Sequence, residues 1–187
     1  MKFSAIKSVG QAYQSEGNYA KAREEYKRAI KMERILPLSK FATQMQIAFS
    51  YLLEKNYDSA RTEFKKLLDY RSLVPAAETH AFLFIGKSYG EEGNPHEARM
   101  NYVKAIESTR TLSPDLQLQT LLDRQCAQMG VADSYFAEKN YIQAKIEYVK
   151  TLAMEKLNAN VRTRAKKQLK TIVDMATPAK SRGTTTK

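Results

Sequence analysis

The residues that could do chemistry in this chain are few, and they form no recognised catalytic pattern. The 187 residues include one cysteine, Cys126, and two histidines, one of them His80. The sequence has no glycine-rich phosphate loop, no nucleophile elbow and no H-E-x-x-H zinc motif. One cysteine and two histidines are too few for a closed zinc site of four Cys or His ligands. We therefore predict no enzyme activity, no catalytic residue, no metal site and no cofactor.

The elements that position these residues follow a recurring pattern of tyrosines and small residues. In the first copy, two groups of residues recur at helical spacing and predict two antiparallel helices. Between them, Gly17-Asn18 breaks the first helix and offers Asn18 as the N-cap of the second. The patterned positions of this copy are Ile6, Val9, Gly10, Tyr13, Ala22, Tyr26 and Ala29.

The same pattern occurs four times. Its first tyrosine recurs at Tyr13, Tyr51, Tyr89 and Tyr135, so two spacings are 38 residues and the last is 46. Ten of the eleven tyrosines occupy only three slots of the pattern, which chance placement would not readily produce. Besides the four tyrosines of the first slot, they are Tyr19, Tyr26, Tyr57, Tyr102, Tyr141 and Tyr148. We interpret these tyrosines as core residues.

The pattern resembles that of tetratricopeptide-repeat proteins, in a variant with long units, over residues 3–155. The resemblance implies an all-α, right-handed superhelical solenoid of helix-turn-helix repeats, at about residues 3–36, 39–73, 75–111 and 114–155. Residues 156–175 are predicted to form a C-terminal capping helix, because their apolar stripe would cover the last repeat. Residues 176–187 are expected to be a disordered tail.

Two helix starts are also predicted. Ser39 is expected to cap a helix over 40–54. Ser113-Pro114 predicts the start of one unbroken helix over 114–138, the longest in the chain. Its leucines, Leu116, Leu118, Leu121 and Leu122, would project past the preceding repeat unless the end of that repeat covers them or a second copy does.

The resemblance also implies a concave groove lined by the first helix of each repeat. Its binding positions are Gln11, Met45, Gln46, Phe49, Leu53, Leu83, Phe84, Lys87, Met129 and Asp133. Large apolar residues in solvent-facing slots indicate a binding surface, although longer helices could bury them against each other. Replacing Phe49 and Phe84 by Ser is predicted to abolish binding with little loss of stability.

Two further functions of the groove are disfavoured by its residues. The tail clamp for the Hsp70 and Hsp90 chaperones is unlikely, because only Lys7 matches among its five positions, and Phe84 replaces the central basic residue. His80 and Cys126 occupy equivalent slots in adjacent repeats and could come close. Without a third orienting group, we interpret them as an inert pair rather than as a nucleophile and base.

Positive charge is concentrated at the C-terminus. The net charge is +11, and residues 156–187 contribute nine basic residues against one acid. Exposed cations of this kind bind phosphates or acidic proteins, but no aromatic residue follows Tyr148 to stack on bases. The candidate basic patch consists of Arg162, Arg164, Lys166, Lys167 and Lys170.

These observations favour a non-enzymatic, cytoplasmic scaffold or adaptor that binds a peptide or helix of a partner protein in its groove. The single cysteine and the lack of a long apolar run support the cytoplasmic location. The alternative is an adaptor that binds an anionic partner, which could be an acidic protein, a nucleic acid or a membrane surface, through the basic patch. Self-association is a third possibility.

Overall fold

The computed structural model describes residues 2–176, and every regular element in that range is helical. Four helix pairs follow one another: α1 (Lys2–Ser15) and α2 (Tyr19–Ile30), α3 (Pro37–Leu53) and α4 (Tyr57–Lys65), α5 (Ala77–Glu92) and α6 (Pro95–Arg110), and α8 (Leu121–Ala137) and α9 (Tyr141–Leu152). The remaining elements are a 3-10 helix η1 (Lys66–Tyr70), α7 (Pro114–Gln119) and α10 (Ala159–Ala176). The predicted tail lies outside the described residues except for Ala176.

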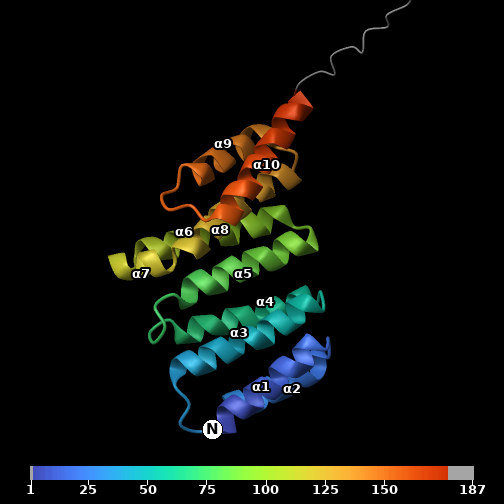
Figure 1. Ribbon diagram of the computed structural model, residues 1–187, viewed down its shortest axis with the longest axis vertical. Coiled ribbons are helices and arrows are strands. Elements are labelled where there is room, and N and C mark those ends of the chain that lie inside the picture. Colours follow the sequence, from blue (N-terminus) through green and yellow to red (C-terminus); the bar gives the residue numbers. More distant parts are fainter. Residues whose placement is uncertain (1, 177–187) are drawn as a thin grey trace, which may run out of the picture.

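The pairs stack in chain order, from α1 and α2 at one end to α10 at the other (Figure 1). The second helix of each pair packs on the first helix of the next pair, so α2 contacts α3, α4 contacts α5 and α6 contacts α8. Helix α10 packs on α9 and closes the stack. The predicted fold class, an all-α solenoid of helix-turn-helix repeats with a C-terminal capping helix, is confirmed.

One type of turn joins the two helices of each pair. The side chains of Asn18, Asn56 and Asn140 each accept a hydrogen bond from the backbone N–H three residues later, at 3.2 to 3.3 Å. The residue before each of these asparagines has a positive φ, which is 60° at both Lys55 and Lys139. The turn therefore requires a left-handed residue, which two of the repeats supply without glycine.

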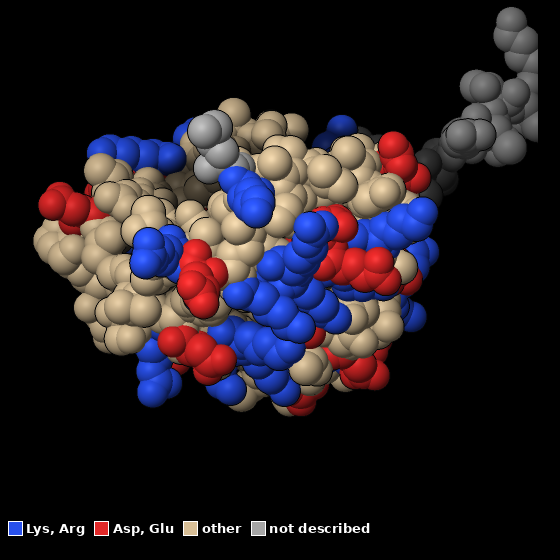
Figure 2. Space-filling model, turned by 90° about the horizontal axis from the view of Figure 1, so that it is seen from below, with Lys and Arg blue, Asp and Glu red and all other residues tan. Residues whose placement is uncertain are grey.

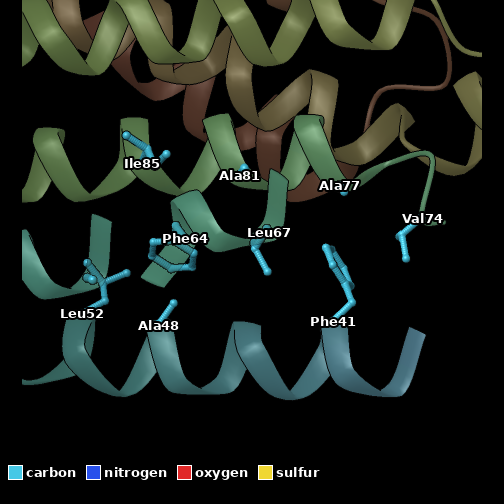
Figure 3. Packing of buried hydrophobic residues seen from close by; sticks show 10 residues of the cluster. Phe41, Ala48, Leu52, Phe64, Leu67, Val74, Ala77, Ala81 and Ile85 are labelled. Carbon is cyan, nitrogen blue, oxygen red and sulfur yellow. The ribbon is translucent and has the colours of Figure 1, made fainter. Parts of the chain in front are cut away.

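The core lies between successive helix pairs. Figure 3 shows the junction of the second and third pairs, where Phe64 and Leu67 point into the space between α3 and α5. Small residues let the helices approach: a Cβ added to Gly10 would lie 2.6 Å from the Tyr26 ring. Two slots in the second half of the repeat are fully buried. The first holds Ala22, Ala60, Ala98 and Ala144, and the second holds Ala29, Leu67 and Ala105.

Two predicted helix boundaries are wrong. Helix α3 begins at Pro37, which occupies the first helical turn, so Ser39 lies inside the helix and does not cap it. The single helix predicted over 114–138 is broken at Thr120 (φ −92°, ψ 8°) into α7 and α8. At the break, the hydroxyl and the backbone N–H of Thr120 both donate to the Leu116 carbonyl oxygen, at 2.8 and 2.9 Å.

Candidate functional site

The predicted neighbours His80 and Cys126 lie on the adjacent helices α5 and α8, beside Asp123. His80 Nδ1 donates to the Ala76 carbonyl oxygen at 2.7 Å, and its Nε2 lies 3.6 Å from Asp123 Oδ2. Burial and the negative charge of Asp123 raise the pKa of the Cys126 thiol. A reactive cysteine needs a lowered pKa, so this environment disfavours the thiolate that a nucleophile requires.

A hollow lies next to this group, between the first helices of the third and fourth helix pairs. Its volume is about 840 Å³. Helices α5 and α8 form its walls, α6 contributes Tyr102, and α10 reaches across with Arg164. Its apolar lining consists mainly of Leu83, Phe84, Tyr102, Leu122 and Ala137, and its polar lining includes Lys87, Glu91, Asp123, Cys126, Asp133 and Arg164. We call it the concave pocket.

Two glycines in the lining of the concave pocket have different surroundings. Gly130 occupies the slot that Gln46 and Phe84 fill in the second and third repeats, and Gly90 occupies the slot that Leu52 fills in the second. Both glycines line the pocket. A Cβ on Gly130 would lie 2.5 Å from the Tyr102 ring, so the ring packs directly against this backbone. At Gly90 the nearest atom to an added Cβ lies 3.7 Å away, so only Gly90 leaves free space where the second repeat carries a side chain.

A half-buried carboxylate, Asp133, joins two residues at one wall of the pocket. Asp133 Oδ1 accepts a hydrogen bond from the Tyr148 hydroxyl at 2.7 Å, and Oδ2 accepts one from Arg164 Nη2 at 2.6 Å. Burial raises the pKa of Asp133, against the opposing effects of the Tyr148 hydrogen bond and the Arg164 charge. Arg164 is 64% exposed at its side chain, so this cation faces the open pocket while it holds Asp133.

The predicted groove residues divide into those that line the concave pocket and those that do not. Leu83, Phe84, Lys87 and Asp133 line it, whereas the other six do not: Gln11, Met45, Gln46, Phe49, Leu53 and Met129. Gln11 and Leu53 are exposed. Lys87 lies 3.8 Å from Glu91, and Gln46 accepts a hydrogen bond of 3.5 Å from Gln14.

Burial separates the apolar members of this set. Leu83 and Met129 are only 6% and 3% exposed, so the expectation that they face solvent is wrong. Their slots point between neighbouring helices because the first helices of adjacent pairs pack closely. Phe49 and Phe84 are half-buried with ring centroids 4.7 Å apart, and Phe84 stacks on Phe64 at 5.4 Å. The burial of Leu83 and Met129 agrees with the alternative that longer helices bury these residues against each other.

The predicted basic patch is also divided. Arg164 belongs to the concave pocket, whereas Arg162, Lys166, Lys167 and Lys170 are exposed on the rest of α10. A second concentration of charge escaped the sequence analysis. The opposite end of the stack, formed by α1 and α2, shows Lys and Arg gathered in a broad area (Figure 2). Residues 2–31 contain seven Lys or Arg and three Glu, so their net charge is +4.

A contact between repeats was also missed, and we call it the junction clasp. Arg23, Arg61 and Arg99 each extend from the second helix of one pair to a tyrosine of the next, with the guanidinium carbon 4.0 to 4.2 Å from the ring centre. Each also pairs with a glutamate three residues after that tyrosine, at 2.6 to 2.7 Å. The three glutamates are Glu54, Glu92 and Glu138.

The junction clasp has a signal in the sequence. The acceptor half reads Ser-Tyr-x-x-Glu in the last three repeats, beginning at Ser50, Ser88 and Ser134. The arginine directly follows a fully buried alanine of the preceding second helix, which is Ala22, Ala60 or Ala98. Arg23 and Arg61 also approach the serine hydroxyl at 3.5 Å. The planar guanidinium can stack and form two parallel hydrogen bonds together, which explains why arginine occupies this slot.

Two absences apply to the described part of the chain. No group of three or more His, Cys, Asp or Glu among residues 2–176 could hold a metal ion. No helix within that range is long and apolar enough to cross a membrane.

Comparisons with known proteins agree with this geometry. The family model described as tetratricopeptide repeat matches residues 8–35 and 79–111. No curated protein matches the chain. Two solved structures are similar to this chain. One contains the nearly identical TPR-like repeats of a Podosopora anserina putative kinesin light chain; it is 15% identical, has a TM-score of 0.64, and the match covers 94% of this chain and 87% of that chain. The other is a variant form of the same repeats; it is 15% identical, has a TM-score of 0.65, and the match covers 94% of this chain and 86% of that chain. The first and third helix pairs thus match the tetratricopeptide repeat, and the chain has the fold of a tetratricopeptide-repeat solenoid.

Proposed function

We propose that this protein is a non-enzymatic, cytoplasmic scaffold that binds a segment of a partner protein in the concave pocket. Tetratricopeptide repeats generally mediate protein–protein interactions. The observation that supports this site is an open hollow of about 840 Å³ whose apolar lining remains accessible. Pockets of several hundred Å³ with an apolar floor and a few polar groups are typical binding sites.

The lining suggests how a bound segment would be held. An apolar side chain of the partner would enter beside Gly90, where the repeat has no side chain of its own, and would contact Phe84 and Leu122. Lys87 and Arg164 would then meet carboxylates or carbonyl oxygens of the segment at the rim. The half-buried Phe49 and the exposed Leu53 would extend the contact toward the second repeat.

The experiment uses two exposed leucines only four residues apart. Leu122 is 49% exposed and lines the concave pocket, whereas Leu118 is 56% exposed and does not. Leu122→Asp places a charge in the pocket without disturbing the core, and Leu118→Asp is its matched control. Proteins would be captured from nuclease-treated lysate at two salt concentrations and quantified by mass spectrometry.

A partner that binds in the pocket is captured by the unaltered protein and by Leu118→Asp at both salt concentrations, and it is lost with Leu122→Asp. Capture that is the same with both variants would refute the concave pocket as the site.

The second candidate function is binding of an anionic partner by the basic patch. It rests on four exposed cations on α10, where Asp174 is the one acid among the described residues. Charge reversal at Arg162, Lys166 and Lys167, together with the salt series, tests it. Capture that vanishes with salt and with this charge reversal, but survives Leu122→Asp, would favour the patch over the pocket.

A further inference from the structure

The convex side of the fourth helix pair carries an apolar stripe with no partner among the described residues. Ile142, Ile146 and Val149 are spaced i, i+4 and i+7 on α9, and they are 76%, 43% and 52% exposed. This spacing places them on one helical face. That face is opposite the buried side of α9, where Ala144, Tyr148 and Thr151 are fully buried.

The neighbouring pair is also apolar in two of these slots. Met100 and Val103 occupy the matching slots of α6 and are 48% and 38% exposed. A furrow of about 250 Å³ separates α6 from α9; Val103, Ile106 and Val131 contribute apolar lining, and charged or polar residues, including Glu107, Glu147 and Lys150, make up most of the rest. We call these five exposed residues and the furrow the convex site.

The same slots in the first two pairs show that the fold does not need apolar residues there. In α2 the slots of Ile142, Ile146 and Val149 hold Ala20, Glu24 and Lys27, and in α4 they hold Asp58, Thr62 and Lys65. Five large apolar side chains on the outer face of one half of a solenoid are therefore unexplained by folding. An exposed apolar patch of this kind marks an interaction surface.

The charged residues around the convex site favour one kind of binding partner over the others. Lys145 and Lys150 lie on α9 on either side of the apolar stripe, and Lys104 and Arg110 are exposed on α6. The acids nearby are Glu107 and Glu147. Glu147 already forms an ion pair with Lys150 at 2.7 Å and accepts a hydrogen bond from Gln128 at 2.7 Å. A second copy would bring two such basic rims together, which like-charge repulsion opposes. An occupant with acidic flanks would be attracted instead.

We propose that the convex site docks an amphipathic helix of a partner protein whose apolar face is flanked by acidic residues. The apolar face would cover Ile146, Val149 and Val103, and the acidic flanks would pair with Lys145 and Lys104. Anchors at i, i+3, i+4 and i+7 are how a helix is recognised by a hydrophobic surface. This site lies on the outer face of the solenoid and is independent of the concave pocket.

A display library tests the proposal directly. Its peptides span about four helical turns, with a fixed leucine stripe and flanking positions randomised among Glu, Gln and Lys. Selection on the immobilised full chain at moderate salt should enrich Glu over Lys at the flanks by about tenfold. The enriched peptide is then titrated by fluorescence anisotropy.

The test variant takes its residues from the same slots of α4: Ile142→Asp, Ile146→Thr and Val149→Lys together. Because α4 already folds with these residues, the variant should keep its helical circular dichroism, and it should bind the enriched peptide about tenfold more weakly. The matched control, Thr62→Ala with Lys65→Ala, and the pocket variant Leu122→Asp should bind it like the unaltered protein.

Three results would overturn the proposal. The first is no enrichment, or enrichment of Lys at the flanks. The second is peptide binding that the triple variant leaves unchanged or that Leu122→Asp abolishes. The third is a dimer, seen by sedimentation across a concentration series, that the triple variant dissociates, because the occupant would then be a second copy.

Discussion

Single residues decide which parts of the concave side are surface and which are core. Phe84 lines the concave pocket, yet its ring also stacks on Phe64 and contacts Phe49. A residue of this kind contributes to stability and to binding together. It is therefore a poor probe of binding alone, whereas the exposed Leu122 is a good one.

We predict that Phe84→Ser lowers the free energy of unfolding by about 2 to 3 kcal/mol, because it removes two ring contacts and leaves a partly filled space. The measurement is urea unfolding followed by circular dichroism. Leu53→Ser is the control, since Leu53 is 53% exposed, and its effect should be within about 0.5 kcal/mol. Equal effects of the two changes would show that the Phe84 ring has no structural role.

The second residue-scale prediction concerns pH. Burial raises the pKa of Asp133 above its ordinary value of 3.8, so the folded state binds this proton more tightly than the unfolded state does. The contribution of Asp133 to stability should therefore fall as pH rises from that value through the folded pKa, and should then level off.

The measurement is the difference in unfolding free energy between the unaltered protein and Asp133→Asn, from about pH 3.5 to about pH 7. We expect this difference to decrease with increasing pH. An increase would mean that the Tyr148 hydrogen bond and the Arg164 charge outweigh burial, and that the pKa is lowered.

At the scale of elements, close packing of helices depends on where glycine stands. Gly130 and Gly90 both line the concave pocket, but only one is sterically required. A Cβ on Gly130 would meet the Tyr102 ring at 2.5 Å, whereas the nearest atom to a Cβ on Gly90 lies 3.7 Å away, an ordinary contact distance.

We predict opposite effects of the two alanine substitutions. Gly130→Ala should destabilise the protein by about 1 to 3 kcal/mol, because Tyr102 must move. Gly90→Ala should stabilise it by about 0.5 to 1 kcal/mol through the helical preference of alanine. Thermal melting measures both, and a stabilised Gly130→Ala protein would contradict the tight contact between α6 and α8.

The sequence predicted the elements well where local signals repeat. The slot of Tyr13 holds a tyrosine in three later copies, and this recurrence located the four helix pairs. Asn18, Asn56 and Asn140 located the turns within three of them. The break at Thr120 was missed because Pro114 and the following leucines read as one continuous helix. Thr120 itself gives no warning, because Thr43 makes the same hydroxyl bond to the carbonyl oxygen four residues earlier and lies inside an unbroken helix.

The candidate site was less predictable because it depends on contacts between distant segments. Phe84, Lys87 and Asp133 were assigned to the concave side from the repeat pattern, and they line the pocket. The approach of Arg164 to Asp133 joins residues 31 positions apart on different elements, so no local pattern reveals it. The sequence could have indicated Gly130 as a pocket residue, because its slot holds Ser8, Gln46 and Phe84 in the other repeats and a glycine only here.

At the scale of the whole molecule, stability passes through the junctions between neighbouring pairs. In a solenoid each unit contacts only its neighbours, so weakening one junction uncouples the parts on either side. The last junction holds α8, α9 and α10 to the rest, and Arg99 connects it through Glu138 and Tyr135.

We predict that Arg99→Gln weakens this junction by about 1 to 2 kcal/mol, because it removes a largely buried ion pair and its aromatic contact. Hydrogen exchange measured by mass spectrometry should show faster exchange in α8 to α10 and unchanged exchange in α1 to α4. The control is Arg110→Gln, an exposed arginine of the same helix. Faster exchange throughout the chain would indicate that the protein unfolds as one unit instead.

The junction clasp has a consequence for assembly. Since each internal junction joins the same arginine to the same Ser-Tyr-x-x-Glu segment, units with both halves free could add to one another and grow as open filaments. The first and fourth pairs each lack one member of the clasp: the first keeps Tyr13 and Glu16 but not the serine, and the fourth lacks the arginine. Ala12 replaces the serine in the first pair, where Lys21 lies over the Tyr13 ring, and Lys145 replaces the arginine in the last. These substitutions oppose head-to-tail polymerisation while the junctions between them remain uniform.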